Sequence, residues 1–397
     1  MDAEDITTTI GCRLKEIRLW RRKTQKAVAE LAGISEGHLS RLESGERALD
    51  SRSLTVALAN ALQVAPSELT ALPVPAPANG DVDAAVDAVR HAMMAVTRGR
   101  PGGQVRTVDE LRARIEALHP ADTERDLEQV GVALPALVRD LHTSIAAGRD
   151  VAELLDLAVL LHAQDTRGWL WMHSASLDLR WQAASLAQQA AQERDTPTAL
   201  GIAAWGAVVE MLAGGAFDLA QAELDSLIVS TTTPESTQLA GMLAMQQSLV
   251  AAAGGRPADV AGPLDEAAEL AQRTGEGDAF WLGFGPTNVG LWRMASALEL
   301  GDYDRVVSIA GGLRPQMHRS KERQATYWLD FGRAAARLRG RRDEAVVALR
   351  RAEELFPTRV LRNPFARATV VELLTRARRD AGGRELRGLA HRMGIAG

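Results

Sequence analysis

The chain has 397 residues, a formal net charge of −5, 46% hydrophobic residues and 24% charged residues, which are ordinary values for a folded protein of two or more domains. Cys12 is the only cysteine, which excludes an internal disulfide and a metal site built from cysteines. Alanine and leucine dominate, and runs of β-branched residues are rare. We therefore expect an all-α protein.

The N-terminal segment Met1–Asp5 is acidic and lacks the apolar core of a signal peptide. No apolar stretch approaches the roughly 20 residues that a membrane-spanning helix needs. These two features predict a cytoplasmic protein with no membrane partner.

Residues 1–72 are predicted to form a compact helical domain that carries local positive charge. Between Ile10 and Arg52 there are 10 Lys and Arg residues against 6 Asp and Glu residues, a local balance of +4. Such a charge run also fits a solvated helix end, so it does not indicate a nucleic-acid partner by itself.

Two short helices are predicted inside this domain, separated by a tight turn. Thr24–Ala32 forms the first, Gly33 supplies the positive φ of the turn, and Ser35 caps the second, which runs to Ser44. The small Ala29 allows the helices to approach closely. The side chains expected to face the interior are Val28, Leu31, Ile34, Leu39 and Leu42. This geometry is a helix-turn-helix, whose second helix enters the major groove of DNA.

Helices are also predicted over Ile10–Arg22, Ser51–Leu62 and from Pro66, so five helices occupy the domain. The residues from Ile10 to Leu72 resemble the XRE family of Cro/repressor-like domains. The resemblance rests on Gln25, Ala29, Gly33-Ile34-Ser35 and the run Leu39–Gly45. It implies a transcription regulator that binds a double-stranded DNA operator.

The chemistry of the exposed face suggests roles for individual residues. Arg41 can donate two hydrogen bonds to guanine, Glu36 can accept one from cytosine, and Gly37 permits close backbone approach. His38 is either a phosphate donor or simply exposed. By the resemblance, Gln25, Ser44 and Arg47 contact phosphates, which fixes register rather than sequence. Arg18 fits equally a phosphate contact or an ion pair with Glu43. The predicted DNA contacts are Arg18, Gln25, Lys26, Ser35, Glu36, Gly37, His38, Ser40, Arg41, Ser44 and Arg47.

A proline-rich linker is predicted over residues 73–80, because Pro73, Pro75 and Pro77 alternate there. Residues 81–397 then show a repeat marked by Gly215, Gly255, Gly301 and Gly340, at spacings of 40, 46 and 39 residues. A small or apolar residue lies five positions beyond each glycine. Each unit is interpreted as a helical hairpin with its glycine at the turn, and such hairpins stack into an α-solenoid. An irregular helical bundle is the alternative.

This block resembles the tetratricopeptide-like repeats that follow XRE domains in actinobacterial regulators, with Phe284–Trp292 as the closest segment. The resemblance implies a sensor and dimerisation domain, and hence a homodimer on the operator.

A ligand groove is predicted on the first helix of each hairpin, at the positions 13 and 10 before the turn glycine. Its residues are Trp205, Met242, Met245, Asn288, Leu291, Tyr327 and Asp330. A mixed surface of this kind suits a small hydrophobic molecule or a peptide. The alternative is that the Trp and Met residues pack in the core.

No HExxH pair, phosphate-binding loop or GxSxG elbow occurs in the sequence. We therefore expect no enzyme, and no catalytic residue, metal or cofactor. Two other functions stay open: a scaffold whose repeats bind a protein and whose first domain tethers it to DNA, and a repressor without any ligand.

Overall fold

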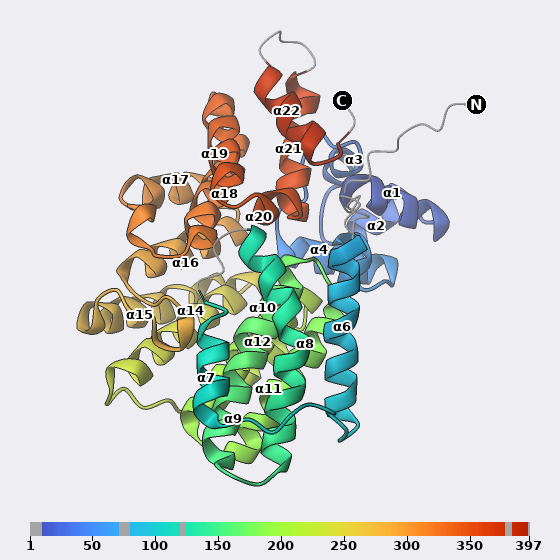
Figure 1. The fold of residues 1–397 in the computed structure, drawn as a ribbon. Coiled ribbons are helices and arrows are strands. Elements are labelled where there is room, and N and C mark those ends of the chain that lie inside the picture. Colours follow the sequence, from blue (N-terminus) through green and yellow to red (C-terminus); the bar gives the residue numbers. More distant parts are fainter. Residues whose placement is uncertain (1–9, 71–79, 120–123, 378–382, 396–397) are drawn as a thin grey trace.

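A computed structural model describes residues 10–70, 80–119, 124–377 and 383–395, and every regular element in these ranges is a helix. This confirms the all-α prediction. The first five helices form one unit, and the later ones form a long stack (Figure 1). The predicted linker at 73–80 lies outside the described residues except for Gly80, which begins α6.

The elements in chain order are α1 (Ile10–Trp20), α2 (Gln25–Leu31), α3 (Glu36–Glu43), α4 (Arg52–Leu62), α5 (Pro66–Thr70), α6 (Gly80–Thr97), α7 (Val108–Glu116), α8 (Glu124–Ala146), α9 (Val151–Leu160), a π-helical turn η1 (Leu161–Thr166), α10 (Arg167–Met172), α11 (Leu177–Arg194), α12 (Pro197–Gly214), α13 (Phe217–Asp225), α14 (Pro234–Ala253), η2 (Pro257–Asp259), α15 (Ala261–Thr274), η3 (Ala279–Trp281), α16 (Pro286–Glu299), α17 (Tyr303–Gly311), η4 (Pro315–Met317), α18 (Lys321–Arg337), α19 (Arg342–Leu355), α20 (Pro357–Leu361), α21 (Pro364–Ala377) and α22 (Arg384–Arg392).

Helices α1–α5 enclose a small apolar core of their own, built on residues such as Leu14, Leu39 and Leu58. Gly11 of α1 lies so close to α3 that a Cβ atom there would sit 2.0 Å from the carbonyl oxygen of Leu42. Only glycine allows this approach, which brings α1 directly against the back of α3. Leu31 is an exception to the predicted core, because 64% of its surface is exposed.

Four helical hairpins follow one another in the later block: α12–α13, α14–α15, α16–α17 and α18–α19. All four predicted turn glycines, Gly215, Gly255, Gly301 and Gly340, have φ between +71° and +80°, which is the left-handed region that favours glycine. The residues five positions later, Ala220, Val260, Val306 and Ala345, are buried. The first helices of successive hairpins pack against each other, so the hairpins stack as a solenoid.

Helix α12 is the one described helix long and apolar enough to span a membrane by length and composition, and 61% of its residues are buried. It packs against α9, α11 and α14, which makes it a core helix of the stack.

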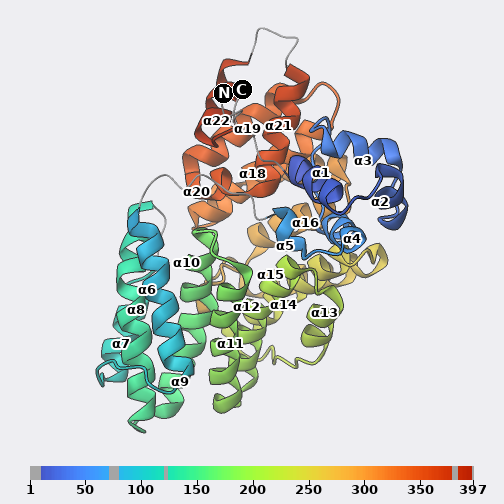
Figure 2. The same ribbon diagram turned by 90° about the vertical axis from the view of Figure 1, so that its right-hand side faces the viewer.

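The N-terminal unit is docked on the solenoid near the ends of α12, α16 and α18 (Figure 2). Asp50, in the segment between α3 and α4, accepts hydrogen bonds from Arg333 of α18 at 2.6 and 2.9 Å. Arg52 donates to Glu299 of α16 at 2.8 Å, and Glu372 of α21 accepts from the backbone N–H of Ala48 at 2.9 Å. The two parts therefore meet through ion pairs and hydrogen bonds in which the carboxylates Asp50, Glu299 and Glu372 are buried.

Candidate nucleic-acid interface

Helix α3 lies on the surface of the N-terminal unit with one face outward. Its start is fixed by Ser35, whose hydroxyl accepts a hydrogen bond from the backbone N–H of His38 at 3.1 Å, and Gly33 has φ +70° at the turn before it. Thr24 caps α2 in the same way, a cap that the sequence analysis did not assign. Ser35, Glu36, Gly37, Ser40, Arg41 and Ser44 are exposed, so this face is accessible in the docked arrangement.

Buried ionic contacts hold α3 from behind. Arg18 of α1 donates two hydrogen bonds to Glu43, at 2.6 and 2.8 Å, and a third to the carbonyl of Lys23 at 3.0 Å. Gln25 donates its side-chain amide to the same carboxylate at 2.8 Å. The hydrogen bonds to Glu43 raise the pKa of Arg18. One carboxylate thus joins α1, α2 and the end of α3.

These contacts correct the prediction for Arg18. Its side chain is only 9% exposed, and its guanidinium is paired with Glu43. Arg18 therefore orients α3 rather than contacting DNA. The alternative role, an ion pair inside the domain, is the one found. Gln25 is half-buried, and its side-chain amide donates one hydrogen bond to Glu43. The predicted contact of Gln25 with phosphate stays a proposal.

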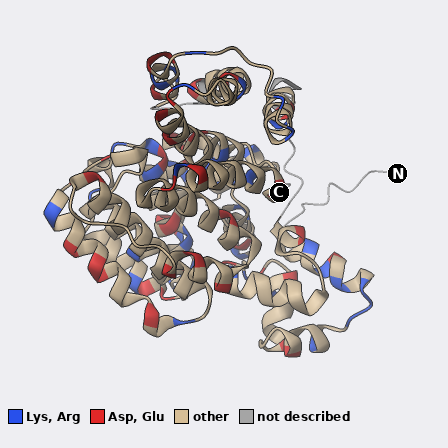
Figure 3. Ribbon diagram, turned by 90° about the horizontal axis from the view of Figure 1, so that it is seen from below, with Lys and Arg blue, Asp and Glu red and all other residues tan. Residues whose placement is uncertain are grey.

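The remaining predicted contacts surround the outward face. Lys26 is exposed on α2, and Arg47 is half-buried just beyond α3. Arg41 donates Nε to the carbonyl of Gly37 at 3.2 Å, and Ser44 donates to the carbonyl of Arg41 at 3.2 Å. Both side chains are aligned along α3 by bonds to its own backbone. Lys and Arg residues, with acidic residues among them, lie on the helices of this unit (Figure 3).

His38 is partly buried within this surface. Burial lowers its pKa, and the nearby charges of Arg47, Arg41 and Arg337 lower it further. The imidazole is therefore neutral at pH 7, with one ring nitrogen able to donate and the other to accept a hydrogen bond.

A basic hollow borders the C-terminal end of α3, and the sequence analysis missed it. Arg41, Glu46 and Arg47 line it from the N-terminal unit, and the solenoid contributes Tyr303, Arg337, Thr375 and Arg376, so four arginines face one carboxylate. Arg376 is half-exposed although it pairs with Glu372. Arg47 and Arg337 are 290 residues apart along the chain, so no local pattern could indicate that the two sides meet.

Residues 9–72 match the family model described as a helix-turn-helix domain. The chain contains a helix-turn-helix domain. The second helix of its helix-turn-helix is α3, and the domain supports a DNA-binding regulator. Comparison of the chain with curated proteins and with solved structures gave no match.

The predicted ligand groove is wrong, because its polar side chains are buried against neighbouring helices. Asn288 donates to the carbonyl of Gly283 at 2.9 Å and accepts from Arg323 at 2.7 Å. Tyr327 donates to the carbonyl of Ala310 at 3.0 Å, and Asp330 accepts from Arg333 at 3.0 Å. Their polar groups serve the packing of the solenoid.

The apolar members of that groove are also packing residues. Met242, Met245 and Leu291 are at most 2% exposed. Trp205 is half-buried beneath the guanidinium of Arg167, 5.2 Å from its ring centre. The alternative, core packing, holds for this set. Leu291 and Asp330 line a different cavity, between the helix-turn-helix domain and the solenoid.

Among the residues that the structure describes, no group of three or more His, Cys, Asp or Glu side chains is placed to hold a metal ion.

Proposed function

We propose that this protein is a cytoplasmic regulator that binds a specific operator in double-stranded DNA through α3 and controls transcription. The observation that carries the proposal is the exposure of α3 while the domain is docked on the solenoid. Its outward face offers a guanidinium, three hydroxyls, a carboxylate and a bare glycine backbone, which together can read base edges and approach them closely. The resemblance to XRE regulators with tetratricopeptide-like repeats supports this proposal.

Direct base reading would come from Arg41, Ser40, Glu36 and neutral His38, whereas Lys26, Ser44, Arg47 and Gln25 would contact phosphates. Phosphate contacts supply affinity that falls with salt, and base contacts supply discrimination. Arg376, from α21, would extend the phosphate contacts beyond the helix-turn-helix domain, because it borders the same hollow as Arg41 and Arg47.

The protein would act as a homodimer, since one reading helix covers too few base pairs for specific affinities of about 10⁻⁸–10⁻¹¹ M. The solenoid would provide the dimer contact and the response to a ligand.

Chromatin immunoprecipitation followed by footprinting on the enriched segments tests the proposal. We expect a protected site with two half-sites about one helical turn apart, or a multiple of it. The proposal would be contradicted if the enriched DNA segments shared no sequence motif, or if the protected site did not contain two half-sites.

A further inference from the structure

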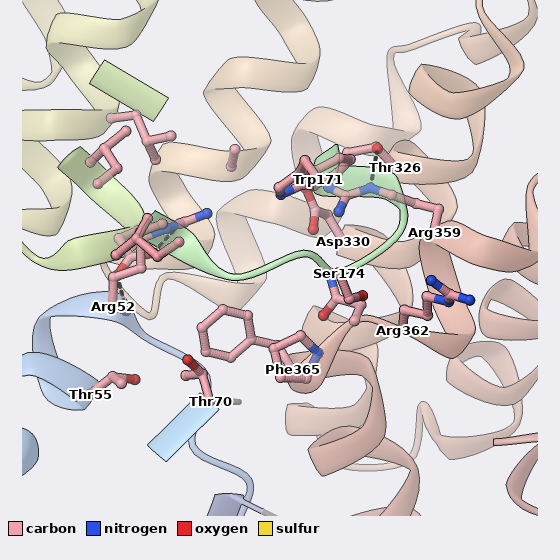
Figure 4. A pocket seen from close by; sticks show the side chains of 18 of the residues that line it. Arg52, Thr55, Thr70, Trp171, Ser174, Thr326, Asp330, Arg359, Arg362 and Phe365 are labelled. Carbon is pink, nitrogen blue, oxygen red and sulfur yellow. Dashed lines mark hydrogen bonds and ion pairs between the residues drawn. The ribbon is translucent and has the colours of Figure 1, made fainter. Parts of the chain in front are cut away.

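A cavity of about 450 Å³ lies between the helix-turn-helix domain and the solenoid (Figure 4). Arg52 and Thr55 of α4 and Thr70 of α5 border it on one side. Trp171, Asp330 and Arg359 border it from the solenoid. Its volume is within the range of small-molecule sites in proteins. A molecule held there would touch both parts of the protein at once.

Positive charge dominates the wall of this cavity. It contains two carboxylates, Glu299 and Asp330, and six arginines: Arg52, Arg180, Arg323, Arg333, Arg359 and Arg362. Several of the arginines are neutralised. Arg52 pairs with Glu299, Arg359 pairs with Glu322, and Arg333 pairs with Asp50 and Asp330.

Two of the arginines, Arg180 and Arg323, have no carboxylate that fully neutralises their charge. Arg180 and Arg167 share one carboxylate, Glu210, at 3.2 Å each, and the three side chains are at most 12% exposed. Burial and the charge of Arg167 lower the pKa of Arg180, although Glu210 opposes the shift. Arg323 donates to the neutral amide oxygen of Asn288, and no carboxylate of the described residues lies within ion-pair distance of it. Partly buried guanidinium charge without a full counter-charge favours an anion.

Aromatic side chains provide an apolar surface next to these charges. Trp171, Trp292 and Phe365 line the cavity, with Leu291 and Leu298 beside them. Arg359 lies 4.6 Å from the ring centre of Trp171, and Arg323 lies 5.9 Å from that of Trp292. The indole N–H of Trp292 is buried and has no hydrogen-bond partner among the described residues. The wall thus combines cationic groups with flat apolar faces.

We infer that the cavity binds a small organic anion with an aromatic or aliphatic body, and that its occupancy changes the affinity of the protein for DNA. The anionic group would lie against Arg323 and Arg180, and the body would pack between Trp171, Trp292 and Phe365. The ligand would contact α4 directly, so its binding would alter how firmly the helix-turn-helix domain is held by the solenoid. The effect on DNA rests on the proposed function, whereas the binding does not.

Isothermal titration of the full chain without DNA tests the binding. The probes are naphthalene-2-carboxylate and straight-chain carboxylates of six to twelve carbons, and the neutral controls are naphthalene-2-carboxamide and decanol. We expect saturable 1:1 binding of at least one carboxylate, and binding of its neutral counterpart at least about tenfold weaker. The inference is overturned if none of these carboxylates saturates, or if the neutral counterparts bind as tightly.

Two variants locate the site. Arg323→Gln should weaken carboxylate binding about tenfold, because it removes the charge and keeps the hydrogen-bond donor. Ala295→Phe should abolish binding by filling the cavity without any change of charge. Arg305→Gln, at an exposed site on α17, and Ala295→Ser are the matched controls and should bind as the wild type does. Circular dichroism confirms that each variant folds. Unchanged binding in both Arg323→Gln and Ala295→Phe would contradict the assignment.

A gel-shift titration on a selected operator, with and without the bound carboxylate, tests the coupling. We expect about a fivefold or larger change in operator affinity for the wild type and none for Ala295→Phe. Equal affinities with and without ligand would overturn the coupling and leave the binding site intact. A failure to bind any operator, together with normal carboxylate binding, would instead count against the proposed function.

Discussion

Asp50 of the helix-turn-helix domain and Arg333 of α18 form a buried ion pair with two hydrogen bonds, at 2.6 and 2.9 Å. They are separated by 283 residues along the chain. Burial alone would lower the pKa of Arg333, but the charges of Asp50 and Asp330 outweigh it and raise the pKa. This pair attaches the helix-turn-helix domain to the solenoid.

Removal of the carboxylate should release the domain. In Asp50→Ala a buried guanidinium loses its main partner, which costs on the order of 3–5 kcal/mol in such pairs. We expect hydrogen–deuterium exchange to increase across residues 45–56 and thermal unfolding to separate into two transitions. Asp265→Ala removes one partner of an exposed pair, Asp265–Arg293, and should change stability by no more than about 0.5–1 kcal/mol. A single unchanged transition in Asp50→Ala would contradict the docking role.

Gly215 offers a second test of docking, with its own matched control. Gly215 and Gly255 both turn between helices at φ +75° and +71°. A Cβ atom at Gly215 would lie 2.5 Å from Val56 of α4, whereas a Cβ atom at Gly255 meets nothing within 4 Å. Both alanine variants should lose about 1–2 kcal/mol of stability from the left-handed backbone.

Only Gly215→Ala should also loosen the helix-turn-helix domain, seen as faster hydrogen exchange over residues 48–56. The double variant with Val56→Ala should restore slow exchange, because it removes the methyl group that clashes. Equal exchange in the two single variants would show that α4 does not depend on this contact.

Buried histidines predict how stability depends on pH. Burial lowers the pKa of His142 to about 4, and burial and the nearby His142 lower the pKa of His162 well below its usual value. The two rings share a hydrogen bond of 2.8 Å between their Nε2 atoms. In the unfolded chain a histidine has a pKa of about 6.5, so the unfolded state binds protons that the folded state does not. Stability is therefore lost as the pH falls from about 6.5 towards 4.

The contribution of His142 alone reaches about 3 kcal/mol at the lower end of that range. Urea denaturation at several pH values between 4.5 and 7.5 measures it. In His142→Asn the free energy of unfolding should depend less steeply on pH than in the wild type, by roughly one proton. His91→Gln, at an exposed site, should leave this pH dependence unchanged. A slope that does not change in His142→Asn would contradict the burial argument.

Arg41 and Lys26 separate base reading from phosphate attraction. Arg41→Ala should lower affinity for the operator by about 1–3 kcal/mol and should scarcely change affinity for random DNA. Lys26→Ala should weaken both by a similar factor and make binding less dependent on salt. Gel-shift titrations at two salt concentrations measure these differences. Equal losses on both DNAs for Arg41→Ala would assign it to phosphate instead.

Local sequence signals predicted the local structure well. The turn at Gly33, the cap at Ser35 and the four hairpin glycines depend on backbone conformation or on neighbours within four residues, and all are confirmed. The prediction that Leu31 faces the interior was wrong. Helical periodicity indicates which face of a helix is apolar, but not how far the neighbouring helices cover that face.

The pairing of polar groups could not be predicted, because it depends on residues far apart in sequence. Asn288, 35 residues before Arg323, seemed available for a ligand until the fold brought the two together. The cavity beside Arg52 likewise lies where the helix-turn-helix domain meets the solenoid, at an interface that includes the Asp50–Arg333 pair. Such sites follow from the docking of whole domains.

The most direct test of the account is a selection of bound duplexes from a random-sequence pool at about 150 mM salt, with the full wild-type chain and with Arg41→Ala. We predict that the wild type enriches a two-part motif and that Arg41→Ala loses the preference at one or two positions in each half. No enriched motif, or the same motif in both proteins, would contradict the claim that α3 reads DNA sequence.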